Sequence, residues 1–214
     1  MKLYYHPLCR HSQKVLIALY EKQAYFHPEI INLNDAQSRH HFKHLSPLIR
    51  LPLLLLHDDT KLPESSIIIE LIDSILETGT QLLPKNMKHS LEIRLYDRLI
   101  DHDLHHAIAA FETEKNRNPL DQLKIKGVKN KITLFLNEMN DKLTSNYWLC
   151  SDHFSLADCT LIPCLFSLQH EFHLLDYEHL GRYWMQAQLR GSYLQVKQEI
   201  ELAHAENRPN PTHN

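Results

Sequence analysis

The sequence predicts two parts of different fold class, an α/β part followed by an all-helical part. Up to about residue 80, short apolar runs that suit strands alternate with segments of helical periodicity, whereas only helical periods follow from Leu82 onward. Residues 77–81 belong to neither pattern and mark the junction. Only 4 glycines occur in 214 residues, which suits a chain made mostly of helices. We therefore expect an N-terminal domain over residues 1–78 and a C-terminal domain over residues 79–206.

The first part is predicted to contain a strand, a helix and a strand, followed by two strands and a helix. The expected strands cover residues 3–5, 27–33, 51–56 and 61–62, and the expected helices cover 12–22 and 65–75. Residues 34–44 are polar and are expected to form a loop with irregular helix, and residues 57–60 suit a hairpin turn. This βαβ–ββα order is typical of a thioredoxin-like domain, in which helices cover both faces of a small mixed sheet.

The second part is predicted to be entirely helical. The expected helices cover residues 88–111, 123–144, 155–168, 180–189 and 192–205. The third of these has a strong start signal, because Ser155 and Asp158 have the spacing of a capping box. The asparagine- and proline-containing residues 207–214 are expected to form a disordered tail.

Composition excludes several classes of protein. The net charge of −3 and the pI near 6.6 show no basic excess, so we expect no direct nucleic-acid partner. No apolar run approaches the roughly 20 residues that span a bilayer, and no signal peptide is evident, so we expect no membrane association. The four cysteines lack the spacing of a disulfide framework. This pattern predicts a reduced, cytoplasmic protein.

Cys9 is the strongest candidate for chemistry. It follows the first strand and a turn at residues 6–8, and the motif Cys9-x-x-Ser12 leads into a helix. This order places a thiol at a helix N-terminus, where the free backbone N–H groups and the macrodipole stabilise a thiolate. Arg10, the next residue, would favour the anion further. The alternative interpretation is a small buried cysteine that precedes an ordinary helix.

Histidine is unusually abundant, with 17 residues in the chain. His102 and His106 are spaced i, i+4, so that they share one helix face and could hold a metal ion. No convincing third ligand stands near them in the sequence. We therefore expect no metal site, and we interpret these histidines as part of a polar helix face or a cleft wall.

Taken together, these motifs resemble the cytosolic glutathione transferase superfamily over essentially the whole chain. The resemblance depends on Cys9, on Leu51-Pro52, on Glu64-Ser65 before a helix, and on the Ser155-x-x-Asp158 box. It implies the glutathione transferase fold and a site for glutathione. It also implies that Leu51-Pro52 is the family's cis-proline element, whose preceding residue offers its backbone to the cysteinyl part of glutathione.

The resemblance also implies roles for particular residues. Glu64 and Ser65 would hold the γ-glutamyl end of glutathione, since a helix N-terminus binds a carboxylate and a glutamate accepts from an ammonium group. Cys9, supported by Ser12, would be the nucleophile, and Arg50 would bind a glutathione carboxylate. The second substrate, a small electrophile or a disulfide, would lie in a cleft between the domains, lined by the three histidines His102, His105 and His106. A homodimer is the usual assembly of the family.

The branch of the superfamily is left open by the sequence. The first strand and residues 151–158 resemble bacterial beta-class transferases, and Cys9-x-x-Ser12 is similar to the omega-class arrangement, in which the thiol forms a mixed disulfide with glutathione. Residues 147–159, with Pro163 and Cys164, instead resemble stringent starvation protein A, a non-catalytic regulator that binds RNA polymerase. That family carries a Pro-His-Pro motif, which residues 76–81 lack, and has no cysteine at the position of Cys9. We therefore favour the enzyme.

Overall fold

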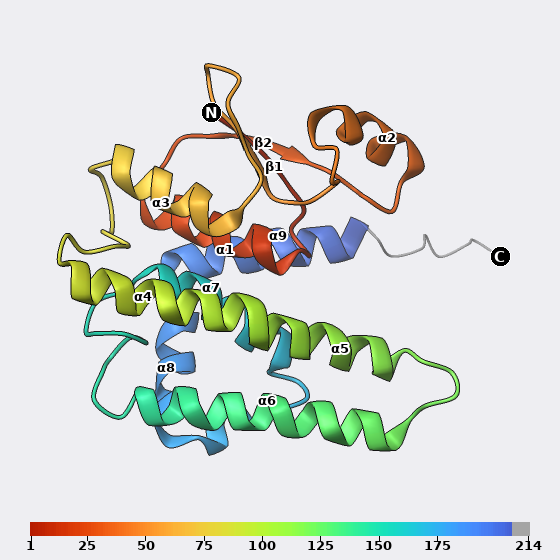
Figure 1. Ribbon diagram of the computed structural model, residues 1–214, viewed down its shortest axis with the longest axis vertical. Coiled ribbons are helices and arrows are strands. Elements are labelled where there is room, and N and C mark those ends of the chain that lie inside the picture. Colours follow the sequence, from red (N-terminus) through yellow and green to blue (C-terminus); the bar gives the residue numbers. More distant parts are fainter. Residues whose placement is uncertain (207–214) are drawn as a thin grey trace. The chain divides into compact units, whose positions relative to one another are not determined.

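The structure is a computed structural model that describes residues 1–206 (Figure 1). The tail predicted for residues 207–214 lies outside the described residues. The described chain forms two compact units. The first unit contains Met1–Thr78 together with the chain from Leu189 onward, and the second contains Gly79–Gln188. The last helix therefore belongs to the first compact unit, although the sequence placed it in a C-terminal domain over residues 79–206.

The first unit is built around a four-stranded sheet. Its elements are β1 (Lys2–Tyr5), α1 (Arg10–Glu21), β2 (His27–Ile30), α2 (Ala36–Leu45), β3 (Leu53–Leu55), β4 (Lys61–Leu62), α3 (Ser65–Ile75) and α9 (Gly191–Glu206). The strand order is β2-β1-β3-β4. Strand β1 is parallel to β2 and antiparallel to β3, which is antiparallel to β4. This mixed sheet confirms the predicted thioredoxin-like domain.

The alternation of side chains along β1 directs its two faces to different helices. Leu3 is fully buried, and Tyr5, on the same face, donates a hydrogen bond to Glu199 of α9. Tyr4 points the other way, and its ring lies 5.9 Å from the ring of Phe42 in α2. Helix α1 packs against both α3 and α9. Helices therefore cover both faces of the sheet, as the sequence predicts.

The second unit contains only helices among its described elements. They are α4 (Met87–Leu99), η1 (Ile100–Leu104), α5 (His105–Lys115), α6 (Gln122–Lys142), α7 (Leu156–Leu168), η2 (Leu174–Asp176) and α8 (Glu178–Gln188). Helix α7 is the core of this unit, since eleven of its residues are buried. Helices α4 and α5 pack against it, α5 also packs against α6, and α8 packs against α6 and α7. The predicted capping box at Ser155 and Asp158 is present at the start of α7.

The strands expected over 27–33 and 51–56 are shorter in the structure, as β2 and β3, and two further predicted segments differ from it. Residues 34–44, expected to be irregular, form the regular helix α2, which begins at Asp35 with a hydrogen bond from the Ser38 N–H to the Asp35 carboxylate. The long helix expected over 88–111 extends from Met87 to Lys115 and contains a five-residue π-helical segment, η1. Figure 1 shows α4 and α5 as one continuous run around this segment. None of the described helices is both long and apolar enough to cross a bilayer.

Candidate active site around Cys9

Cys9 is the N-cap residue of α1, as the sequence predicts. Its N–H donates to the carbonyl of His6 at 2.9 Å, and its own carbonyl accepts from the N–H of Gln13 at 2.9 Å. These two bonds close the β1–α1 turn and start the helix. The Cys9 side chain makes no capping hydrogen bond. The thiol is therefore held at the positive end of the helix macrodipole, where an anion is stabilised.

The second part of the site is the segment before β3. The Leu51–Pro52 peptide bond is cis, in agreement with the motif. The Cys9 Sγ atom lies 3.8 Å from the carbonyl oxygen of Leu51. Both residues line a cavity of about 280 Å³ in the first unit. Its lining residues are His6, Leu8, Cys9, Ile31, Asn32, Leu33, Asn34 and Leu51. A partly exposed thiol and a backbone hydrogen-bonding edge therefore face the same small space.

His6 is a lining residue that the sequence analysis did not identify. Burial lowers the pKa of the His6 imidazole, which favours the neutral ring. The Leu8 N–H donates to His6 Nδ1 at 3.1 Å, so Nδ1 is the acceptor and the proton of the neutral ring lies on Nε2. His6 can therefore offer an N–H donor to a ligand.

Asn32 and Asn34 also line the cavity and were also missed. Asn32 Oδ1 accepts from the Asn34 N–H at 3.0 Å, which fixes the turn after β2 and leaves amide N–H groups as possible donors. The signal that could have found them is topological. Strands β1 and β2 are parallel, so the residues that follow each strand meet at the same edge of the sheet.

The other residues predicted for this site lie around these elements. Ser12 is fully buried, and its hydroxyl accepts from the N–H of His6 at 3.3 Å. Pro52 is buried beside Leu51, and Ser65 is the buried first residue of α3. Arg50 and Glu64 are exposed and lie 3.9 Å apart. Within the described chain, the residues that line the Cys9 cavity include Leu51 from the predicted glutathione-binding set but not Arg50, Pro52, Glu64 or Ser65.

The three predicted second-substrate histidines lie in the second unit. His102 and His106 are exposed, whereas His105 is buried, with its Nδ1 3.9 Å from the Asp101 carboxylate. They are held by the π-helical segment η1 and the first turn of α5. The structure therefore divides the three into an exposed pair and one buried residue.

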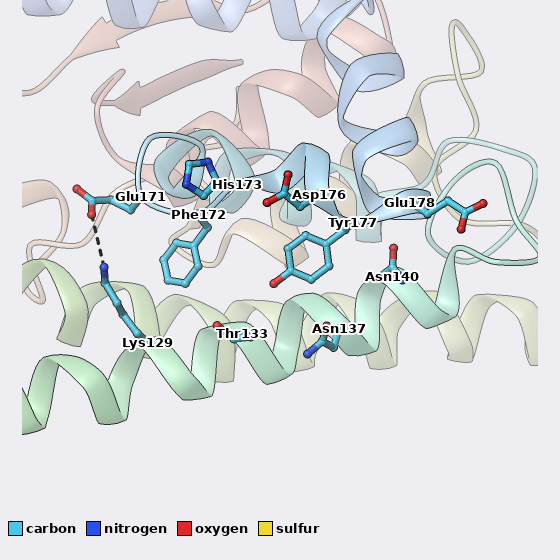
Figure 2. Close-up of a pocket in the computed structure, with 10 residues that line it drawn as sticks. All are labelled: Lys129, Thr133, Asn137, Asn140, Glu171, Phe172, His173, Asp176, Tyr177 and Glu178. Carbon is cyan, nitrogen blue, oxygen red and sulfur yellow. Dashed lines mark ion pairs between the residues drawn. The ribbon is translucent and has the colours of Figure 1, made fainter.

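A second cavity, of about 600 Å³, lies in the second unit between α6 and the segment that leads into α8 (Figure 2). The rings of Phe172 and Tyr177 point toward α6, on which Thr133 and Asn137 lie one turn apart (Figure 2). Glu171 closes one end with an ion pair to Lys129 at 3.9 Å. The residues known to line this cavity include no cysteine. It can hydrogen-bond a polar molecule, but it offers no thiol for the predicted chemistry.

The fold resembles that of known proteins. Residues 3–78 match the sequence model of the glutathione S-transferase N-terminal domain. The chain has the glutathione transferase fold. A glutathione S-transferase from Methylobacillus flagellatus, solved with GSH bound, is 25% identical to it, covers 91% of this chain and 98% of its own, and has a TM-score of 0.82. Glutathione transferase F7 from Populus trichocarpa is also 25% identical, with coverages of 93% and 98% and a TM-score of 0.82.

More distant structures share the same fold. Glutathione S-transferase 1-6 from Anopheles dirus species B is 16% identical, with coverages of 97% and 100% and a TM-score of 0.86. At that identity the likeness concerns the fold alone. No curated protein sequence shows significant similarity to this chain. The comparisons therefore support the resemblance to glutathione transferases at the level of the superfamily and leave the branch undecided.

Proposed function

We propose that the protein binds glutathione in the Cys9 cavity and transfers thiol groups through Cys9. The observation that carries this proposal is that a thiol at a helix N-terminus and the Leu51 backbone line one cavity. The glutathione transferase fold around that cavity supports glutathione as the ligand, since a similar protein was solved with GSH bound.

The proposed reaction has two thiol–disulfide exchanges. In the first, the Cys9 thiolate attacks the glutathione sulfur of a mixed disulfide, so that a Cys9–glutathione disulfide forms and the substrate leaves as a thiolate, which takes up a proton. In the second, the thiolate of a free glutathione attacks the same sulfur, which releases oxidised glutathione and restores the Cys9 thiolate. No other oxidant or reductant is needed. Conjugation of glutathione to a small electrophile is the alternative reaction for the same site.

The proposed binding roles follow from chemistry and position. The Leu51 backbone, presented by the bond to Pro52, would pair with the cysteinyl backbone of glutathione. Ser65 at the N-terminus of α3 would bind a carboxylate, and Glu64 would accept from the ammonium group. Arg50, which is exposed, would turn from Glu64 toward a carboxylate of the ligand.

Ser12 would act through the backbone in this proposal. Its hydroxyl accepts from the His6 N–H, so it holds the turn that carries Cys9. The proposal for the second substrate, a disulfide or a small electrophile near His102, His105 and His106, depends on the family resemblance alone. The same resemblance leads us to propose a homodimer. The cysteine pattern leads us to propose a cytoplasmic protein, and the proposed reaction at Cys9 needs no metal.

The first test is a calorimetric titration of glutathione into the reduced protein and its Ser65→Ala variant. Ser65→Ala is expected to weaken binding by roughly tenfold, since it removes one hydrogen bond to a charged group. Unchanged affinity would remove Ser65 from the proposed site.

A second test separates binding from chemistry. Cys9→Ser is expected to abolish the exchange of a glutathione mixed disulfide, whereas Cys150→Ser, which changes another partly buried cysteine, is expected to leave the rate unchanged. Exchange that survives Cys9→Ser at the normal rate would refute the assignment of the nucleophile.

The polymerase-binding alternative makes the opposite prediction. If the chain is a regulator similar to stringent starvation protein A, glutathione is not bound at millimolar concentration, and RNA polymerase subunits are retained from a lysate. The two experiments together distinguish an enzyme from a regulator that retains only the fold.

A further inference from the structure

The π-helical segment η1 brings two exposed histidines together. His102 lies within η1 and His106 lies in the first turn of α5. Their ring centroids are 4.8 Å apart, with an interplanar angle of 69°. The His102 side chain is 59% exposed, so that an ion from solvent can reach the pair. Two imidazoles spaced i, i+4 on one helix face are a recurrent half of protein metal sites.

The hydrogen bonds of both rings fix which nitrogen atoms remain available. His102 Nδ1 lies 3.0 Å from the Asp103 carboxylate, and His106 Nδ1 bonds the backbone carbonyl of His102. An ionised carboxylate and a carbonyl only accept hydrogen bonds, so both Nδ1 atoms carry the proton. In the neutral rings, both Nε2 atoms therefore keep a lone pair.

This is the arrangement found around histidines that ligate metals. Such a histidine donates its other ring N–H to a carboxylate, a backbone carbonyl or water, which orients the ring and raises its basicity. His102 has the carboxylate partner and His106 has the carbonyl partner. The sequence suggested no metal site because it shows no third ligand, but the outer hydrogen bonds that tune such a site become visible only in the structure.

We propose that His102 and His106 bind a late first-row divalent cation, such as Zn²⁺, Ni²⁺ or Cu²⁺, through their two Nε2 atoms. Imidazole suits these ions, whereas Mg²⁺ and Ca²⁺ require oxygen ligands. Two protein ligands leave coordination positions open to water or to a donor group of another molecule. The site uses no atom of Cys9, but it would share His102 and His106 with the second-substrate pocket proposed above.

The chain offers a matched comparison on another helix. His40 and His44 in α2 are also exposed and spaced i, i+4, with ring centroids 5.2 Å apart. Within residues 1–206, the contacts of these two rings are ring–ring contacts, and neither ring has a hydrogen-bonded acceptor. If the hydrogen bonds made by the two Nδ1 atoms strengthen metal binding, His102 and His106 bind the ion more tightly than His40 and His44.

The test uses Zn²⁺ alone as the probe on the full chain with ¹⁵N-labelled histidine. Long-range ¹H–¹⁵N spectra are expected to show that Zn²⁺ shifts the Nε2 signals of His102 and His106 first, while their Nδ1 atoms stay protonated. The double variant His102→Ala/His106→Ala should lose this tightest site, and His40→Ala/His44→Ala should keep it. Asp103→Ala should weaken it by 10- to 100-fold.

Several results would overturn the proposal. Coordination through Nδ1, tightest binding at His40 and His44, or no shift at His102 and His106 at millimolar Zn²⁺ would each contradict it. The spectra of the unmodified protein decide the first and third of these outcomes, so that the conclusion does not depend on the folding of a variant.

Discussion

Two opposing effects act on the ionisation of Asp158, at the start of α7. It is fully buried, and its carboxylate accepts from the Leu149 N–H at 2.9 Å and from the Ser155 N–H and hydroxyl at 2.8 Å each. These hydrogen bonds favour the ionised form, whereas burial opposes it. Burial has the larger effect and raises the pKa of Asp158 to about 6. The contribution of this carboxyl group to the stability of the protein therefore depends on pH.

The sign of this linkage follows from the raised pKa. Because the folded protein holds the proton more tightly than the unfolded chain, the contribution of Asp158 to stability is complete below about pH 3.8 and is lost as the pH rises through about 6. Between pH 4 and 7, the wild type should lose about 2 kcal/mol of unfolding free energy relative to Asp158→Asn. Denaturant titrations of both proteins at each pH measure this difference, in which the other carboxylates cancel. If the unfolding free energy of the wild type minus that of Asp158→Asn instead stays constant or increases with pH, the hydrogen bonds outweigh burial.

At the scale of elements, the sequence predicts most helices because their signals are local. Helix α3 begins and ends where its apolar pattern does, and the start of α7 follows from the capping box. Helix α2 was missed because Phe42 is its only buried residue, so that it has almost no apolar periodicity. The π-helical turn of η1 has no comparable signal. A single extra residue in a helical turn leaves no compositional mark.

The candidate site was predictable only in part for a related reason. Cys9 and Leu51 belong to motifs that can be read along the chain, and both line the cavity. His6 and Asn32 line it because they follow two parallel strands, whose ends meet at one edge of the sheet. This proximity depends on the strand pairing and has no local sequence pattern. The sequence therefore indicates the candidate thiol more readily than the groups that line the cavity around it.

Helix α9 provides the sharpest test at this scale. Glu21 of α1 accepts from Arg190, the residue before α9, at 2.7 and 2.5 Å and from the hydroxyl of Ser192 in the first turn of α9 at 2.5 Å. The Glu21 side chain is only 6% exposed. Arg190→Ala would remove the guanidinium that pairs with this buried carboxylate, and we expect a loss of roughly 3–5 kcal/mol of unfolding free energy.

An exposed ion pair within α9 provides a control for this variant. Lys197 and Glu201 form an exposed ion pair at 3.8 Å, so that Lys197→Ala should cost less than about 1 kcal/mol. Urea unfolding of the three proteins gives the comparison. Equal losses in the two variants would mean that burial of Glu21 adds nothing to the strength of its ion pair.

At the scale of the whole molecule, the first unit is assembled from both ends of the described chain. The sheet and helices α1–α3 come from residues 1–78, and α9 comes from the other end. Glu199 of α9 accepts hydrogen bonds from Tyr5 of β1 and Tyr20 of α1. The unit that carries Cys9 therefore depends on a segment nearly 200 positions away in sequence, and a domain boundary near residue 78 does not enclose it.

This dependence predicts the effect of ending the chain after Gln188. The shortened protein lacks Arg190 and Glu199, so that Glu21, Tyr5 and Tyr20 lose the hydrogen bonds that they make to these two residues. Because the loss of hydrogen bonds to buried polar groups is costly, amide protection in α1 should fall at least tenfold in hydrogen exchange. Glutathione binding, if present in the full chain, should be lost with it. The amides of α6, whose unit retains all its residues, provide the reference within the same sample. Full protection of α1 in the shortened chain would show that residues 1–78 fold without α9 and would restore the simpler domain boundary.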